Sequence, residues 1–154
     1  MLVKIANDID AVQTVQILWA EYWEGLGLSD EFQGFEEELL TLPGKYAAPK
    51  GMLAIAYVEG FPAGTIALRP LVADACELKR LYVRPPFRRR GVARGLLEWI
   101  LEHARTLGYR SVYGDTLPTM NAAMQLYYDL GFRVIDRPYS DSPTPGAIYL
   151  ELRI

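Results

Sequence analysis

The chain has 154 residues, of which 51% are hydrophobic and 23% are charged, and its formal net charge is −3. This length suits one domain with a continuous core, which we expect to span residues 1–154. Because the sequence has no run of 18 apolar residues and no signal peptide pattern, we expect a cytoplasmic protein that does not bind membranes. A single cysteine and a single histidine argue against a disulfide framework and a conventional zinc cluster, so we expect no metal.

Hydrophobic periodicity and turn residues predict the elements of the first half of the chain. These are a strand over 3–6, a helix that begins at Asn7 or Asp8 and ends at Gly25 or Gly27, and a shorter helix from Ser29 or Asp30 to about Leu42. Two strands over 52–59 and 63–71 flank the turn formed by Gly60, Phe61 and Pro62, which predicts an antiparallel hairpin.

The second half continues with a strand over 76–84 that ends at Pro85 and Pro86, since proline cannot donate a ladder hydrogen bond. A helix is predicted from Val92 to a C-cap at Gly108. A strand over 111–114, a helix over 120–130, and strands over 132–136 and 147–153 follow. The order of these elements predicts an α/β (mixed α+β) fold, in which a mixed sheet carries helices on both faces.

Charge is distributed unevenly along the chain. Residues 5–44 contain nine acidic side chains and no basic one, whereas residues 79–94 contain seven basic side chains and no acidic one. A basic segment of this kind predicts contact with a polyanion. Since the calculated pI is about 5.2 and the segment is short, a small phosphorylated ligand is favoured over nucleic acid.

The centre of the basic segment lies where a predicted strand leads into a predicted helix. The amides at a helix N-terminus have no intrahelical partner, and together with the helix dipole they suit a pyrophosphate group. The alternative is a solvated basic turn. The residues concerned are Arg88, Arg89, Arg90, Gly91, Val92, Ala93 and the following Arg94.

Three segments resemble the GCN5-related N-acetyltransferase (GNAT) superfamily. The run CELKRLYVRPPFRRRGVARGLL is similar to its acyl-coenzyme A motif, Q/R-x-x-G-x-G/A, with Arg88, Gly91 and Ala93 at the defined positions. The run AAMQLYYDLGF is similar to its second motif, which places Tyr127 four residues before Gly131 and Phe132. The terminal PGAIYLELRI resembles its last strand.

This resemblance implies that acetyl-CoA is the cosubstrate and that the sheet is splayed to admit the pantetheine arm. The backbone of Leu81, Tyr82 and Val83 would line that arm. The family often has an asparagine seven residues before the tyrosine, but Met120 stands there in this chain. Asn121, the next residue, is therefore expected either to make a weak contact with coenzyme A or to mark the start of a helix.

Acyl transfer to an amine needs a base for the ammonium and a proton for the departing thiolate. Glu77, 14 residues before Gly91, matches the position of a general base in some family members; alternatively, it pairs with Lys79 on the same strand face. Tyr127 is the candidate general acid, and its neighbour Tyr128 would point elsewhere on the helix. Asp115 either binds a substrate ammonium or, as we favour, caps a turn.

The expected function is acetyl transfer from acetyl-CoA to a primary amine of a small molecule or a protein. The acidic excess of the first two helices predicts a cationic acceptor, unless it is a plain solvated face. Tyr139 and the loop over 142–146 either close over the acceptor or simply connect two strands. The alternative functions are a non-catalytic acyl-CoA sensor and a nucleic-acid module, and the last strand is a candidate for pairing in a homodimer.

Overall fold

The sheet organises the whole chain, and the computed structural model describes it over residues 1–27, 34–139 and 145–154. Seven strands lie in the order β1-β2-β3-β4-β5-β7-β6. All neighbours pair antiparallel except β4 and β5, which pair parallel. The expected mixed sheet is thereby confirmed. The strands are β1 (Leu2–Ile5), β2 (Met52–Val58), β3 (Phe61–Pro70), β4 (Ala75–Val83), β5 (Ser111–Thr116), β6 (Arg133–Ile135) and β7 (Ile148–Arg153).

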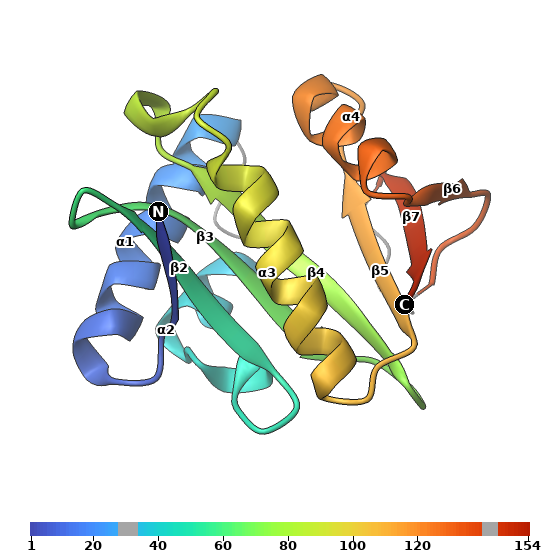
Figure 1. The fold of residues 1–154 in the computed structure, drawn as a ribbon, viewed down its shortest axis with the longest axis horizontal. Coiled ribbons are helices and arrows are strands. Elements are labelled where there is room, and N and C mark those ends of the chain that lie inside the picture. Colours follow the sequence, from blue (N-terminus) through green and yellow to red (C-terminus); the bar gives the residue numbers. More distant parts are fainter. Residues whose placement is uncertain (28–33, 140–144) are drawn as a thin grey trace.

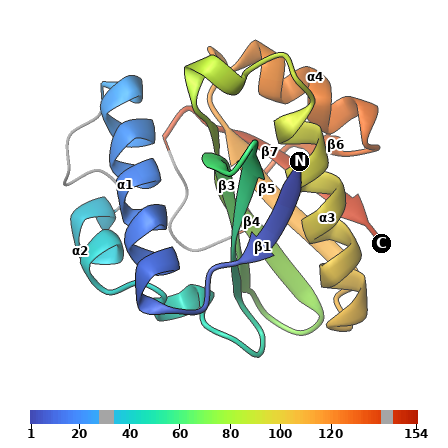
Figure 2. The same cartoon turned by 60° about the vertical axis from the view of Figure 1, so that its left-hand side comes forward.

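Helices cover both faces of this sheet, as predicted (Figures 1 and 2). On one face lie α1 (Ile9–Leu26) and α2 (Phe35–Leu40), and on the other lie α3 (Val92–Thr106) and α4 (Asn121–Asp129). Each face has its own apolar core, one built around α1 and the other around α3. Within the described ranges, no helix is long and apolar enough to cross a membrane.

The ends of α1 follow the predicted capping signals. The Asp8 side chain accepts a hydrogen bond from the Ala11 amide at 2.8 Å, and Gly27 adopts a left-handed conformation with a φ of 66° just beyond the last turn. Gly25 lies inside the helix instead of ending it. The predicted start of the second helix, at Ser29 or Asp30, falls outside the described residues, and α2 ends at Leu40, two residues earlier than expected.

Two strand boundaries differ from the predictions by two residues, and the others agree to within one residue. The β2–β3 turn is formed by Glu59 and Gly60, which have φ angles of 53° and 83°, and Phe61 already belongs to β3. A two-residue turn with both φ angles positive matches the twist of a hairpin. The strand pairing therefore extends to Phe61, which was predicted to lie in the turn. The other difference is β5, which extends to Thr116 because its pairing with β7 continues to Ile148.

The two parallel strands separate soon after they pair. Only Ala75, Cys76 and Glu77 of β4 pair with β5, although β4 continues to Val83. Beyond Glu77, the β4 edge that faces β5 therefore has no ladder partner. This is the splayed arrangement that the resemblance implied, and Figure 1 shows the two strands diverging towards the ends of α3 and α4 that lie beside the opening.

A β-bulge lies in the diverging part of β4. Ala67 pairs with Lys79 and Thr65 pairs with Tyr82, so Ile66 alone faces the two residues Arg80 and Leu81. Arg80 has a φ of 59°, which is uncommon for a residue with a side chain. Bulges bend a strand and redirect a side chain, and this one turns Arg80 towards the face covered by α1 and α2.

We expect Gly64→Ala to destabilise the fold by about 2 kcal/mol, because a Cβ there would lie 2.6 Å from the Tyr82 carbonyl oxygen and would push β4 away beside its bulge. Gly114→Ala in β5 is the matched control, since its Cβ would meet its nearest atom at 4.0 Å. Urea unfolding of both variants tests this. Equal stabilities of the two variants would contradict it.

Candidate active site

A pocket opens where β4 and β5 diverge, and it is lined from both faces of the sheet. On the side of α3 and α4 its wall includes Leu81, Thr116, Met120, Ala123 and Tyr127. On the side of α1 and α2 its wall includes Tyr22, Trp23, Leu26, Lys79, Arg80 and Asp115. The pocket thus passes through the sheet, so two molecules can approach each other in it from opposite faces.

Tyr127 is fixed in this pocket by the way α4 ends. The amide of Phe132 donates to the Tyr127 carbonyl at 3.0 Å, the amide of Gly131 donates to the Tyr128 carbonyl at 3.0 Å, and Gly131 has a φ of 96°. This is a Schellman motif, whose characteristic apolar contact is here the edge-to-face packing of Tyr127 on Phe132 at 5.2 Å. The spacing of Tyr127 from the Gly-Phe pair therefore has a local structural cause.

The two adjacent tyrosines of α4 have different surroundings. Tyr127 is 7% exposed and lines the pocket, whereas Tyr128 is 47% exposed. Burial raises the pKa of the Tyr127 phenol above its ordinary value, and Tyr22 and Asp115 act in the same direction. The phenol therefore keeps its proton at neutral pH.

The α3 side of the pocket has polar groups suited to a thioester arm. The Thr116 hydroxyl is buried and has no hydrogen-bond partner among the described residues. Leu81, Tyr82 and Val83 lie half-buried on β4, beyond its last pair with β5. An extended ligand with amide groups, such as the pantetheine of acetyl-CoA, fits this set because it can hydrogen-bond to a bare strand edge.

The basic loop leads directly into α3. Gly91 precedes α3 with a φ of 79°, no side chain caps the helix, and the space around Gly91 is open to 4 Å. Arg88, Arg89 and Arg90 are exposed, and Val92 is buried. The Arg88 Nε donates to the Val83 carbonyl at 2.9 Å. An uncapped helix N-terminus beside exposed arginines suits a pyrophosphate.

The remaining predicted contacts lie at the margins of this region. Ala93 is half-buried in the first turn of α3. Arg94 is exposed and pairs with Glu98 at 3.3 Å and with Asp129 at 3.6 Å. Asn121 is the exposed first residue of α4 and follows Met120, which occupies the N-cap position.

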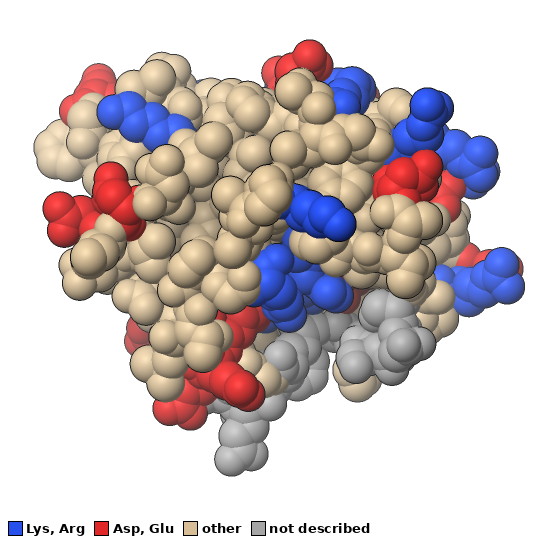
Figure 3. Space-filling model, turned by 90° about the horizontal axis from the view of Figure 1, so that it is seen from below, with Lys and Arg blue, Asp and Glu red and all other residues tan. Residues whose placement is uncertain are grey.

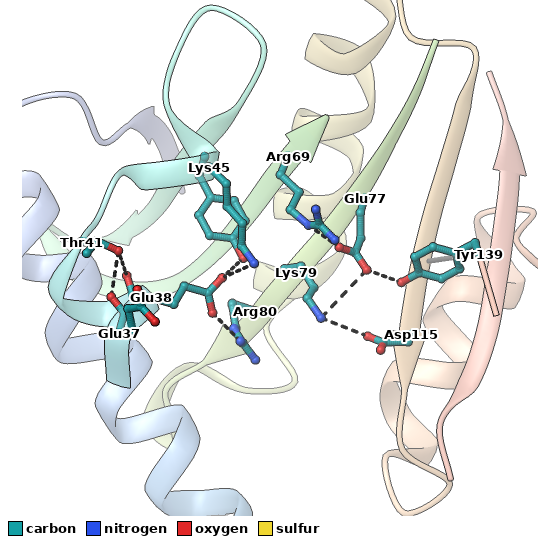
Figure 4. A network of polar contacts seen from close by, with 11 residues as sticks. Glu37, Glu38, Thr41, Lys45, Arg69, Glu77, Lys79, Arg80, Asp115 and Tyr139 are labelled. Atoms are coloured by element: carbon teal, nitrogen blue, oxygen red, sulfur yellow. Dashed lines mark hydrogen bonds and ion pairs between the residues drawn. The ribbon is translucent and has the colours of Figure 1, made fainter. Parts of the chain in front are cut away.

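The opposite face of β4 carries a buried network of charged side chains (Figure 4). Arg80 pairs with Glu38 of α2 at 2.5 Å, and its guanidinium lies 5.0 Å from the Trp23 ring and 5.4 Å from the Phe35 ring. The Tyr46 hydroxyl donates to the same Glu38 carboxylate. Residue spacing does not identify Arg80 as a site residue, because the bulge that turns it inwards leaves no signal in the sequence pattern.

Glu77 lies in this network and is 2% exposed. Arg69 Nε donates to its Oε1 at 2.6 Å, the Tyr139 hydroxyl donates to its Oε2, and Lys79 Nζ lies 3.9 Å from Oε2. The structural alternative, pairing with Lys79, is therefore present at ion-pair distance. The role of Glu77 as a base stays a prediction.

Asp115 lies inside a strand and not just beyond its end, where the expected turn cap would stand. It lies within β5, opposite Tyr149, and its Oδ1 is 3.7 Å from Lys79 Nζ. Because β5 continues to Thr116 and successive side chains of a strand point to opposite faces, the Asp115 side chain lies on the α1 face of the sheet, where it lines the pocket.

The described acidic side chains of the first two helices do not line this pocket. Glu21 pairs with Arg84 at 2.7 Å, Glu38 pairs with Arg80, and Glu24, Glu36 and Glu37 are exposed. Asp30, Glu31 and the loop over 142–144 fall outside the described residues. Figure 3 shows one face of the molecule, on which basic side chains lie near acidic ones.

Comparison with known proteins shows what class of protein has this fold and site. Residues 13–132 match the acetyltransferase (GNAT) family. An uncharacterized N-acetyltransferase of Schizosaccharomyces pombe is 34% identical over 99% of this chain and 92% of its own length. The uncharacterized N-acetyltransferase YjgM of Escherichia coli is 32% identical over 76% of this chain and 71% of its own length.

Solved structures share the fold at low sequence identity. An acetyltransferase of the GNAT family from Staphylococcus aureus superposes with a TM-score of 0.82, at 18% identity, over 99% of both chains. The PaiA N-acetyltransferase of Thermoplasma acidophilum, solved in complex with coenzyme A, has a TM-score of 0.77 at 18% identity over 100% of both chains. The chain described here belongs to the GNAT acetyltransferase family.

We expect Arg80→Met to lower the free energy of unfolding by about 3 kcal/mol at neutral pH, because it leaves the buried Glu38 with only the half-exposed Lys45, at 3.4 Å, as a charge partner. Burial alone would raise the pKa of Glu38, but the Arg80 charge and the hydrogen bonds from Tyr46 and Arg80 hold it below 4.5. Because the pKa of Glu38 is lower in the folded state than in the unfolded state, its ion pair stabilises the fold above pH 4.5. This stabilisation is lost as the pH falls through the pKa of Glu38 in the folded state.

The difference between the natural chain and this variant should therefore shrink below pH 4.5, as followed by urea unfolding across pH. Arg105→Met is the control, because Arg105 belongs to an exposed pair with Glu102 at 3.3 Å and should cost about 0.5 kcal/mol or less. A difference that stays constant down to pH 3 would contradict the expectation.

Proposed function

We propose that this chain transfers the acetyl group of acetyl-CoA to a primary amine by direct attack of the amine on the thioester. The observation that carries the proposal is the pocket through the sheet, with the buried Tyr127 on one side and charged side chains on the other. The uncapped start of α3 and the bare edge of β4 support binding of the CoA part on the α3 side.

The transfer requires one bond to form and one to break. The amine nitrogen bonds to the carbonyl carbon, and the bond between that carbon and the sulfur then breaks. Tyr127 gives its proton to the departing thiolate and regains one through water from the positively charged nitrogen of the adduct, which thereby becomes the neutral amide nitrogen. Burial raises the pKa of this phenol, so it is protonated at neutral pH and carries a proton when the thiolate departs.

The amine must lose a proton to become a nucleophile, and we propose that Glu77 takes it through water. Glu77 does not line the pocket itself, but Lys79 and Asp115 do, and Lys79 lies between Glu77 and Asp115. Each carboxylate oxygen has two acceptor positions, so the donors Arg69 and Tyr139 leave room for a water molecule.

Tyr127→Phe should lower kcat by about 10²-fold and leave the acetyl-CoA dissociation constant unchanged, because it removes only the proton donor. Tyr128→Phe is the matched control, since it deletes the same hydroxyl from the exposed neighbour. Thiol release measures turnover and calorimetric titration measures binding. Unchanged turnover in Tyr127→Phe would exclude the general-acid role, and binding without thiol release in the natural chain would favour a sensor.

Glu77→Gln should lower kcat about 10²-fold near neutral pH, with recovery as pH rises and free amine becomes available without a base. Glu151→Gln is the control, because Glu151 is also a buried carboxylate paired with an arginine, Arg133 at 2.8 Å, but lies outside the pocket. A kcat that equals that of the natural chain at every pH would leave Glu77 with a structural role only.

A further inference from the structure

We propose that the acceptor amine carries a carboxylate close to its amino group, as a free amino acid does, and that Lys79 recognises this carboxylate. The inference rests on the proposed acetyl transfer and names its substrate class. It differs from the cationic acceptor expected from the acidic helices, because the described acidic side chains of those helices lie outside the pocket. The charged side chains in the pocket wall are Lys79, Arg80 and Asp115.

The charges around the acceptor side favour a ligand with no net positive charge. Within the described ranges, the ion pairs of this network join four basic side chains and three acidic ones, an excess of one positive charge. Glu37, also drawn in Figure 4, is exposed and takes part through its main-chain carbonyl, so its carboxylate is not counted. A simple ammonium would raise this excess to two in a largely buried site, whereas an amino acid, with an ammonium and a carboxylate, adds no net charge. Charge complementarity of this kind sets specificity. The basic side chains are Lys45, Arg69, Lys79 and Arg80, and the acidic ones are Glu38, Glu77 and Asp115.

Of the two basic side chains in the pocket wall, Lys79 is better placed to donate hydrogen bonds to a ligand. Its side chain is 12% exposed, and its ammonium lies 3.9 Å from Glu77 Oε2 and 3.7 Å from Asp115 Oδ1. Both separations allow an ion pair but exceed the length of a hydrogen bond. An ammonium has three N–H donors, so a carboxylate in the pocket would supply the acceptor that a nearly buried ammonium needs.

Arg80 is less suited to this task. Its guanidinium is 5% exposed, pairs with Glu38 at 2.5 Å and lies against the Trp23 and Phe35 rings. These contacts hold the bulge and the first two helices together. Lys79 is therefore the carboxylate-binding residue, and Arg80 contributes positive potential to the same wall.

The amino group of the acceptor would then lie towards the gap between the strands. Asp115 lies across that gap from β4 and supplies a negative charge for an ammonium. Tyr127 lies on the side of the pocket that α3 and α4 cover. Tyr22, Trp23 and Leu26 form the apolar part of the wall, which suits an apolar side chain on the acceptor.

The experiment compares each common amino acid with its own carboxamide as acceptor, using thiol release from acetyl-CoA by the full-length chain. The carboxamide keeps the amine and the side chain but lacks the carboxylate, so it also represents a protein N-terminus. We expect kcat/KM at least tenfold higher for the best amino acid than for its carboxamide, because a charged hydrogen bond is lost.

Lys79→Met should remove this preference by lowering kcat/KM for the amino acid about tenfold while leaving the carboxamide unchanged. Lys50→Met deletes an equal charge at an exposed position outside the pocket, and it should keep the preference. Calorimetry with acetyl-CoA alone checks that donor binding is intact in both variants.

The outcomes separate the two proposals. If carboxamides, or a diamine such as putrescine, are acetylated as fast as the amino acids, the carboxylate proposal is overturned and acetyl transfer is supported. A preference that survives in Lys79→Met would overturn the role of Lys79. Acetyl-CoA binding with no thiol release from any amino acid would also overturn the substrate class, and absence of acetyl-CoA binding would overturn the proposed function itself.

Discussion

The strands β4 and β5 share ladder hydrogen bonds only over residues 75–77 and 111–113, and each then continues without the other. A strand edge inside a protein needs hydrogen-bond partners, so the parting of two central strands is a costly feature unless a ligand fills it. The pocket, the position of Tyr127 and the approach from two faces all depend on this separation. The bulge at Arg80 lies in the diverging segment and sets which β4 side chains face which side.

The buried charges on the α1 face show how the bulge is held. Arg80 lies in a left-handed conformation on β4, and its ion pair with Glu38 joins that strand to α2, while aromatic rings from α1 and α2 enclose the guanidinium. A buried ion pair adds little net stability compared with an apolar contact, but it strongly disfavours arrangements that separate its partners. The network therefore fixes the relative positions of the acceptor wall and of the β4 edge.

The two halves of the pocket differ in chemistry. On the α3 side, an uncapped helix, exposed arginines and a bare strand edge offer donors to an anionic, amide-rich molecule. On the α1 side, the wall combines aromatic rings with Lys79 and Asp115. In the proposed reaction, this division would let the donor and the acceptor be selected independently, since each would be recognised on its own face of the sheet.

The sequence by itself determined the features that are local in origin. The helix caps at Asp8 and Gly27, the start of α3 after Gly91 and the end of α4 just before Gly131 depend on residues within one or two turns, so spacing and residue type were sufficient. The tertiary structure alone decided which side chains share the pocket. Arg80 faces inwards because of a bulge in the β3–β4 register, and Asp115 lines the wall because β7 extends the pairing of β5. Register and strand length depend on partners far away in the chain, which residue patterns along one segment do not specify.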